Sequence, residues 1–406
     1  MSGTLSAISD FLGWDNAPSD QVSIIVTGGG TSRQITNWTS AVLRLGVEIM
    51  PWTAALGMTA ARASAAGADT INPGDTCQVY IGSDLVFTGY VITVIEDLGP
   101  EDHLIEVQIA SKSVDLVECA AEFTTFQMNS TNVLAIARAV ARRVNIDVIS
   151  VNDAGNTDIL AFSIIMTETA YEVIERLCRL AGVLFYDQPD GNICMSGVGT
   201  RRAASGFTVG RNIERAQIVR SLGGRYSSVI AINQNTVSLF TDPNVNALES
   251  QMSALTVGIE ATDPGVPRRR TMFIPVENGD ENNKVCQQRA QWEVNRRYGR
   301  AYPVTLTADS WRDASGQLWL PNTRVPVTGR NGIGPDMLIG ELTLRQTVED
   351  GTHADVVLMP PSAFSPEPLL NPVMKDRFLQ IMHSAQADVD HSIQTEDLPP
   401  LDGTAQ

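Results

Sequence analysis

The sequence predicts a mainly β protein with an α+β insert, on two observations. Short stretches in which apolar and polar residues alternate recur over residues 21–110 and again over about 205–360, and this is the period of a half-buried strand. Between them, over residues 129–198, apolar residues recur at the spacing of one helical face. We therefore expect two β-rich regions separated by a compact α+β region.

Residues 1–20 are expected to form an N-terminal extension, and the first β-rich region is placed at residues 21–125. Its clearest hairpin is CQVYIGSDLVFTGYVITVIED, in which Gly82, Ser83 and Asp84 make the turn. One face of the return strand is expected to hold Leu85, Phe87, Val91 and Ile95. The strand HLIEVQIAS alternates in the same way, with Ile105, Val107 and Ile109 on one side. This region is predicted to be a small barrel or sandwich.

Three glycines, Gly28 to Gly30, follow a strand in VTGGGTS and superficially resemble a phosphate loop. A dinucleotide-binding loop needs a glycine spacing and a helix that are missing here, and a Walker loop needs Gly-Lys. The residues that follow, SRQITNW, have the pattern of a strand. A hairpin turn is the favoured interpretation.

The α+β insert is placed at residues 126–200. STNVLAIARAVARRVN and TAYEVIERLCRLAG each put their apolar residues on one helical face. The second helix opens with Thr169 and Glu172 at the spacing of a capping box, and it ends at Gly182, which tolerates a left-handed conformation. A hairpin is then expected around the Pro-Asp-Gly of VLFYDQPDGNICM.

The second β-rich region is placed at residues 201–362 and contains one helix and a peripheral α+β part. The helix is expected from Glu281 to Tyr298, with an acidic start that complements the helix dipole and a buried stripe made of Cys286, Ala290, Val294 and Tyr298. Residues 363–406 are rich in proline and acids, so they are predicted to form an extended, mobile tail.

The segment QWEVNRRYGRAYPVTLTADSWRDASGQLW holds four arginines, three tryptophans and two tyrosines. Such interleaving is typical of nucleic-acid surfaces, because arginine neutralises phosphate and aromatic rings stack on bases. A structural role competes, since Glu293 stands four residues from both Arg289 and Arg297. Trp311 and Trp319 flank the turn DASG and are expected to pair across a hairpin or to plug the end of a barrel. The structural interpretation is favoured.

No catalytic, cofactor-binding or metal-binding residue is predicted. The five cysteines lack a CxxC pair and are expected to be buried free thiols, and none of the four histidines has a second histidine or cysteine at metal-ligand spacing. A formal net charge of −17 opposes nonspecific binding to DNA or to an anionic membrane. The sequence has no bilayer-spanning apolar stretch and no signal-peptide pattern at its start, which predicts a cytoplasmic site of synthesis and no membrane anchor.

Several of these segments, spread over about residues 20–370, resemble the tail hub (baseplate hub) proteins of Mu-like contractile-tailed bacteriophages. The resemblance is carried by RAQWEVNRRYGRAYPVTLTADSWRDASGQLWLPNTRVPV, by TAYEVIERLCRLAGVLFYDQPDGNI, by VFTGYVITV followed by IEVQIASKSVDLVECAA, and by DMLIGELTLRQTVEDGTHADVVLMPPSAFSPEP. The same architecture is similar to the hub portion of type VI secretion spike proteins.

The resemblance implies a homotrimeric ring with two barrel-like tube domains and smaller α+β domains in each subunit. Such a protein is a structural virion component of the tail baseplate, made in the host bacterial cytoplasm. Its expected partners are the tail tube, the central spike and other baseplate (wedge) proteins, and DNA is met only in transit through an acidic lumen. Two alternatives from other classes are a spike-tip enzyme that degrades the cell envelope and a carbohydrate-binding β protein. No enzymatic activity is expected.

Overall fold

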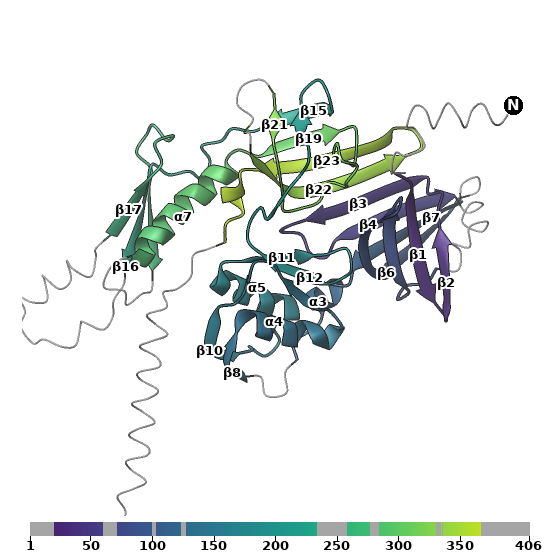
Figure 1. The fold of residues 1–406 in the computed structure, drawn as a ribbon, viewed down its shortest axis with the longest axis horizontal. Coiled ribbons are helices and arrows are strands. Elements are labelled where there is room, and N and C mark those ends of the chain that lie inside the picture. Colours follow the sequence, from purple (N-terminus) through teal and green to yellow (C-terminus); the bar gives the residue numbers. More distant parts are fainter. Residues whose placement is uncertain are drawn as a thin grey trace, which may run out of the picture.

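The computed structural model describes residues 20–59, 71–99, 103–122, 127–233, 258–276, 284–329, 334 and 336–366. The expected N-terminal extension and most of the expected C-terminal tail therefore lie outside the described residues. The described chain is mainly β, as predicted, and none of its helices is long and apolar enough to cross a membrane. In Figure 1 the largest sheet, the insert and a small helix-bearing unit form three distinct bodies.

The first β-rich region forms seven strands that follow one another as an antiparallel array. These are β1 (Val22–Gly28), β2 (Thr31–Ile35), β3 (Ser40–Gly46), β4 (Thr53–Thr59), β5 (Thr76–Ile81), β6 (Asp84–Leu98) and β7 (His103–Ser111). The predicted hairpin between residues 77 and 97 is present as β5 and β6, with Ile81 opposite Asp84. The three-glycine segment is the turn between β1 and β2, in which Gly29 and Gly30 take φ values of 56° and 80°. Both turn predictions are confirmed.

The predicted face of β6 is wrong at its far end. Phe87 and Val91 are buried, whereas Ile95 is 43% exposed. The register shifts between Val91 and Thr93, as at a β-bulge, so the residues beyond the shift change sides of the strand. No alternation rule applied to the sequence could place this shift.

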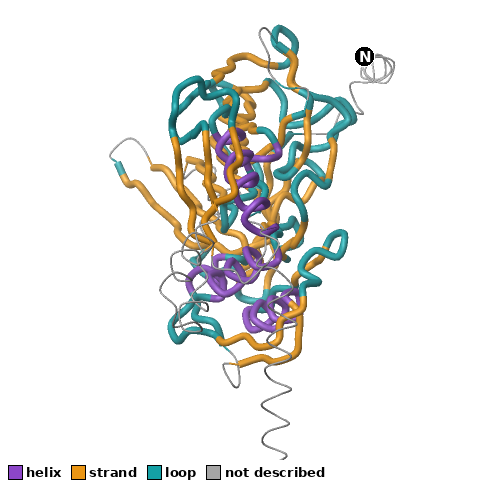
Figure 2. The backbone as a smooth tube through the Cα atoms, turned by 90° about the vertical axis from the view of Figure 1, so that its left-hand side faces the viewer, coloured by secondary structure: helices purple, strands orange, loops and turns teal. Residues whose placement is uncertain are grey.

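The insert forms two amphipathic helices against two small sheets. Its elements are α3 (Val114–Glu118), β8 (Gln127–Asn132), α4 (Val133–Ala141), η3 (Arg142–Val144), β9 (Val148–Ser150), β10 (Asp158–Ser163), α5 (Ala170–Ala181), β11 (Leu184–Asp187) and β12 (Ile193–Ser196). The first of them, α3, precedes the expected start at residue 126, but its Leu116 lies in the core of this unit. The capping box of Thr169 and Glu172 is present in both directions, and Gly182 ends the helix at φ 62°. Figure 2 shows the helices of the insert grouped apart from the longer helix of the second region. The predicted α+β character of this segment is confirmed.

The second region contributes strands to three different sheets. Its elements are β13 (Arg201–Arg202), β14 (Phe207–Thr208), β15 (Ile213–Ile218), β16 (Ser228–Asn233), β17 (Gly258–Thr262), β18 (Thr271–Val276), α7 (Lys284–Arg300), β19 (Val304–Ala308), β20 (Thr323–Val325), β21 (Val327–Thr328), β22 (Met337–Thr347), β23 (Gly351–Met359) and η5 (Pro361–Ala363). Strands β16, β17 and β18 form a separate sheet that α7 covers on one face.

The expectation of two barrels needs correction. Among the described residues no barrel closes, because strands of both regions belong to one 13-stranded sheet, whose main path runs β15-β19-β23-β22-β3-β4-β7-β6-β5-β1-β2. The junction is the antiparallel pair of β3 and β22, in which Leu45 lies opposite Leu342. Strand pairing between segments about 300 residues apart leaves no trace in local periodicity, which explains the difference.

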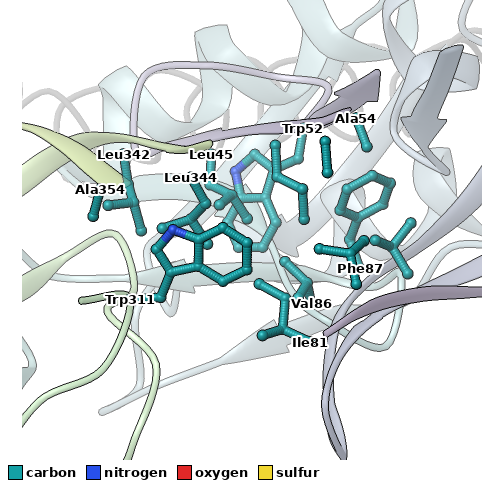
Figure 3. Close-up of a cluster of buried hydrophobic side chains, with 14 of the residues drawn as sticks. Leu45, Trp52, Ala54, Ile81, Val86, Phe87, Trp311, Leu342, Leu344 and Ala354 are labelled. Atoms are coloured by element: carbon teal, nitrogen blue, oxygen red, sulfur yellow. The ribbon is translucent and has the colours of Figure 1, made fainter. Parts of the chain in front are cut away.

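One core lies beneath this junction and is shared by both regions. Trp311, with no exposed surface, sits between Leu342, Leu344 and Ala354 of the second region and Ile81 and Val86 of the first (Figure 3). Trp319 is 2% exposed, donates its backbone N–H to Trp311 O at 2.9 Å, and lies 4.5 Å from the Phe207 ring. The two tryptophans therefore pair across their turn and fill the core, as predicted.

Two smaller expectations also change. Cys77, Cys178, Cys194 and Cys286 are buried free thiols, but Cys119 is exposed. The buried stripe of α7 includes Cys286, Ala290 and Val294, whereas Tyr298 is 46% exposed and its ring lies 5.0 Å from that of Tyr302 in a tilted arrangement. The expected acidic start of this helix, at Asp280 and Glu281, lies outside the described residues.

Candidate assembly surface

Eight neighbouring strands of the large sheet present one continuous side that no other described element covers. We call this side the open face; it is formed by β15, β19, β23, β22, β3, β4, β7 and β6. Its residues align in rows across the strands, because Gln108 lies opposite Ala55, Ala55 opposite Val42, and Val42 opposite Arg345. The buried leucines and valines of the same strands point to the opposite side, into the shared core.

Small and polar side chains dominate the open face. They include Ser40, Ala55, Gly57, Thr59, Thr93, Thr305, Thr307, Thr343 and Thr347, and each of them is at least partly exposed. The four-strand groups β15-β19-β23-β22 and β3-β4-β7-β6 each contribute half of this surface. Threonine suits a pleated strand and also tolerates water. The open face is therefore built to stay solvated rather than to receive another hydrophobic layer.

Charges on the open face occur as pairs of opposite sign. Arg44 contacts Glu341 at 2.7 Å, and Arg345 contacts Asp355 at 2.6 Å. Partial burial acts to raise the pKa of the Asp355 carboxyl, but hydrogen bonds from Arg345 and Thr307 outweigh it and hold that pKa below its usual range. The open face thus carries both signs.

One end of the eight-strand array is a strand edge that is mostly unpaired within the described part of the chain. There, β15 forms a ladder with β19 alone, apart from a single bridge between Ile213 and Val209, and it is exposed along most of its length. Arg215 lies on β15, and the exposed apolar residues Ile218 and Val219 follow at 37% and 41% exposure. An unpaired edge with apolar neighbours is a site where another strand can add.

The other end of the array is a second unpaired edge, and it carries acids. Strand β5 pairs with β6 only from Asp84 to Tyr90, so among the described residues the part of β6 beyond the bulge pairs with β7 alone. This part holds Glu96 and Asp97 together with exposed Ile95 and Leu98, the latter 70% exposed. Both edges therefore combine an open backbone with exposed apolar residues. They differ in charge, because the β6 edge carries two acids whereas β15 carries Glu214 beside Arg215.

The arginine-rich helix α7 makes contacts within the chain. Arg296 donates to Ser365 O at 3.0 Å, Arg300 contacts Glu48 at 2.5 Å, and Arg297 contacts Glu293 at 2.6 Å. Arg289 lies over the ring of Trp292 at 4.6 Å, and burial lowers the pKa of its guanidinium. The predicted pairing of Glu293 with Arg297 is confirmed. The partner of Arg300 is 252 residues distant in sequence and was not predictable.

The described residues bring together no group of three or more His, Cys, Asp or Glu side chains that could hold a metal ion. His353 lies between Glu214, at 3.0 Å from its Nδ1, and the carbonyl of Asp350. His383 and His391 lie outside the described residues, as does the side chain of His103. The other polar clusters in the described chain connect one secondary-structure element to another.

A buried carboxyl joins the insert to the large sheet. Asp187 of β11 is 1% exposed, and its Oδ2 accepts hydrogen bonds from the Trp52 N–H at 2.9 Å, from Ser111 at 2.7 Å and from Ser113 at 2.9 Å. Burial raises the pKa of Asp187 to about 6, against the lowering effect of these three donors. Its Oδ1 has no partner among the described atoms.

Comparison with known proteins agrees with this architecture segment by segment. The model of the N-terminal domain of Mu phage baseplate assembly protein GpP-like proteins matches residues 21–109. The model of the second domain of baseplate hub protein gp44-like proteins matches residues 113–197. The model of the fourth domain of Mu phage baseplate assembly protein GpP matches residues 282–367. Models of a first, a second and a fourth domain of phage baseplate proteins therefore match in this order along the chain.

Whole-chain comparisons agree. The baseplate hub protein gp44 of Escherichia phage Mu is 26% identical over 366 residues, covering 88% of this chain and 92% of that protein. The 43 kDa tail protein of prophage MuSo2 from Shewanella oneidensis superposes with a TM-score of 0.71 at 24% identity, over 87% of this chain and all of that one. A type VI secretion component of E. coli, c3393, shares the fold with a TM-score of 0.52 at 10% identity, over 86% and 79% of the two chains.

The fold and the matched domains define a structural component of a phage tail. The chain belongs to the baseplate hub proteins of Mu-like phages. A protein of this family is associated with the virion.

Proposed function

We propose that this chain is the hub that joins the tail tube to the central spike, as a homotrimer whose lumen conducts DNA. In this proposal, residues 21–125 and 201–362 supply the ring, with β16, β17, β18 and α7 at its periphery. Residues 126–200 form a peripheral domain that faces other baseplate (wedge) proteins. Residues 1–20 and 363–406 are extensions outside the ring.

The observation that carries the proposal is the pair of unlike edges on one eight-strand array. A contact between β15 of one copy and the far part of β6 of the next is heterologous, so successive copies form a ring if the rotation closes. Closure removes both exposed edges, which are otherwise sites for uncontrolled pairing. Glu96 and Asp97 would repel each other in a contact between two β6 edges, whereas β15 carries Glu214 beside Arg215 and has no net charge, so the unlike pairing is favoured over contacts between two β6 edges.

The open face supports the conduit part of the proposal. In a ring closed through these edges, the shared core lies outside and the open face lines the lumen. Its arginines Arg44 and Arg345 are each within 2.7 Å of a carboxylate, so they have little capacity left to bind phosphate. DNA then meets small polar side chains and passes without being retained.

The test of the ring uses one variant on the proposed interface and one matched control. Ile95→Asp places a charge on the free edge of β6, whereas Val348→Asp changes an equally apolar residue, 72% exposed, in the turn after β22. At tens of micromolar, light scattering of the parent and of V348D is expected to give a trimer, and electron micrographs a ring with a central hole. I95D is expected to be monomeric. A parent that stays monomeric with tube and spike protein present would refute the proposal.

No hydrolase activity is proposed for this chain, since its relatives are structural baseplate hub proteins. The envelope-degrading alternative predicts that the purified protein clears a peptidoglycan suspension and that one carboxylate substitution abolishes the clearing. We expect no clearing. We also propose that the chain is made in the cytoplasm of the host bacterium, without a membrane anchor, before it joins the baseplate.

A further inference from the structure

A groove of about 350 Å³ lies between the insert and α7, away from the open face. Its apolar lining includes Met50, Tyr171, Val183, Phe185, Trp292 and Phe364, and the charged residues Glu48, Glu175, Arg179 and Arg296 line it as well. We call it the α5–α7 groove. Its walls come from four parts of the chain, namely the segment between β3 and β4, α5 with the start of β11, α7, and residues 364–366.

The apolar residues of this lining are only partly covered by the described chain. Met50, Tyr171, Val183, Phe185 and Trp292 all keep intermediate exposure. An uncovered apolar groove of this kind is unfavourable in water and marks a place where another apolar group binds. The groove therefore needs an occupant.

The last described residues of the chain enter this groove. Phe364, 2% exposed, fills one end. Ser365 is held through its carbonyl, which accepts from Trp292 Nε1 at 2.8 Å and from Arg296 at 3.0 Å. Pro366 itself lines the groove. The position and the direction of the chain at this point are thus fixed by α7.

The sequence that follows Pro366 is Glu-Pro-Leu-Leu. An extended chain covers about 3.5 Å per residue, so Leu369 and Leu370 are bound to lie within about 11 and 14 Å of Pro366. Covalent connection keeps them at a high effective concentration at the groove, and Pro368 reduces the entropy that docking removes. We propose that Leu369 and Leu370 of the same chain occupy the α5–α7 groove. The C-terminal segment would then clasp the insert to α7.

Hydrogen exchange of the full chain tests this inference. The double variant Leu369→Asp/Leu370→Asp is compared with a matched double variant farther along the tail, Leu398→Asp/Leu401→Asp. Loss of the leucines should uncover the end of α5, so amides over residues 178–185 are expected to exchange roughly tenfold faster in the first variant and at the parent rate in the second. If both variants exchange at the parent rate, Leu369 and Leu370 do not occupy the groove. Its occupant would then be a partner protein.

Cross-linking gives a second readout that does not depend on stability. In a Cys119→Ser background, which removes the exposed native thiol, Met50→Cys is combined either with Leu370→Cys or with Leu401→Cys. A disulfide within one chain is expected to form readily with the first partner and slowly with the second, at a rate independent of protein concentration. Equal rates for the two pairs, or a disulfide found only between two chains, would overturn the proposal. Neither readout depends on ring assembly, so a failure here is distinct from a failure of the hub proposal.

Discussion

Replacing Trp311 with alanine tests whether the two β-rich regions are one cooperative unit. The indole has no exposed surface, and its Nε1 donates to His353 O at 2.8 Å. Truncating a buried tryptophan costs about 3–5 kcal/mol, to which the unpaired carbonyl adds roughly 1 kcal/mol or more. In a large domain each kcal/mol lowers the melting temperature by about 2–4 °C, so a combined loss of about 4–6 kcal/mol lowers it by roughly 8–24 °C. Calorimetry is expected to show this shift in the transition that contains the large sheet.

The control is Phe273→Ala on β18, because this aromatic side chain is 61% exposed and lies outside the shared core. Its removal is expected to change stability by about 0.5 kcal/mol or less. If W311A melts like the parent, the reasoning from burial fails. If it melts like the parent but no longer assembles, Trp311 is instead an anchor of a subunit interface.

Two further predictions concern charge. The pKa of Asp187 is raised to about 6 in the folded state from about 3.9 in the unfolded state. The folded state therefore binds this proton more tightly, and the free energy of unfolding falls as pH rises from about 4 to 6. Asp187→Asn keeps an acceptor for Ser111 and Ser113, so in urea titrations it is expected to flatten this slope and to raise the free energy of unfolding at pH 7 by up to about 3 kcal/mol. A parent-like slope in this variant would contradict the assignment. In a gel shift at physiological salt, the parent protein is expected not to bind duplex DNA appreciably, and changing both Arg296 and Arg300 to alanine is expected to leave that result unchanged. Micromolar binding that is weakened by these two substitutions would instead support the nucleic-acid interpretation.

The features that the sequence predicted correctly are those set by neighbours along the chain. The capping box of Thr169 and Glu172 and the glycine turn after β1 depend on residues within one turn of structure. The pairing of Glu293 with Arg297 follows from helical spacing alone.

The features that the sequence did not predict depend on distant partners. Arg44 meets Glu341 across the junction of β3 and β22, 297 residues apart. The edge on β6 that belongs to the candidate assembly surface exists because β5 stops pairing at Tyr90 while β6 continues. A bulge that turns Ile95 outward has no signature in a pattern of alternating residues. Strand order and register determine which residues form the candidate assembly surface, and they could be obtained only from the structure.

A ring closed through strand edges requires a fixed angle between the two strand groups of each subunit, and one short segment supplies that constraint. Trp311 fills the core between the groups, and Arg312, 8% exposed, contacts Asp20 at 2.8 Å and Asp84 at 2.5 Å while donating to Ile81 O at 3.1 Å. These partners belong to the first β-rich region, whereas Trp311 and Arg312 belong to the second. A buried ion held by several acceptors is costly to move, because any displacement leaves a desolvated charge unpaired. The arginine and tryptophan of this segment thus serve to hold the geometry of the sheet, which is why residues that resemble a nucleic-acid site are turned inward.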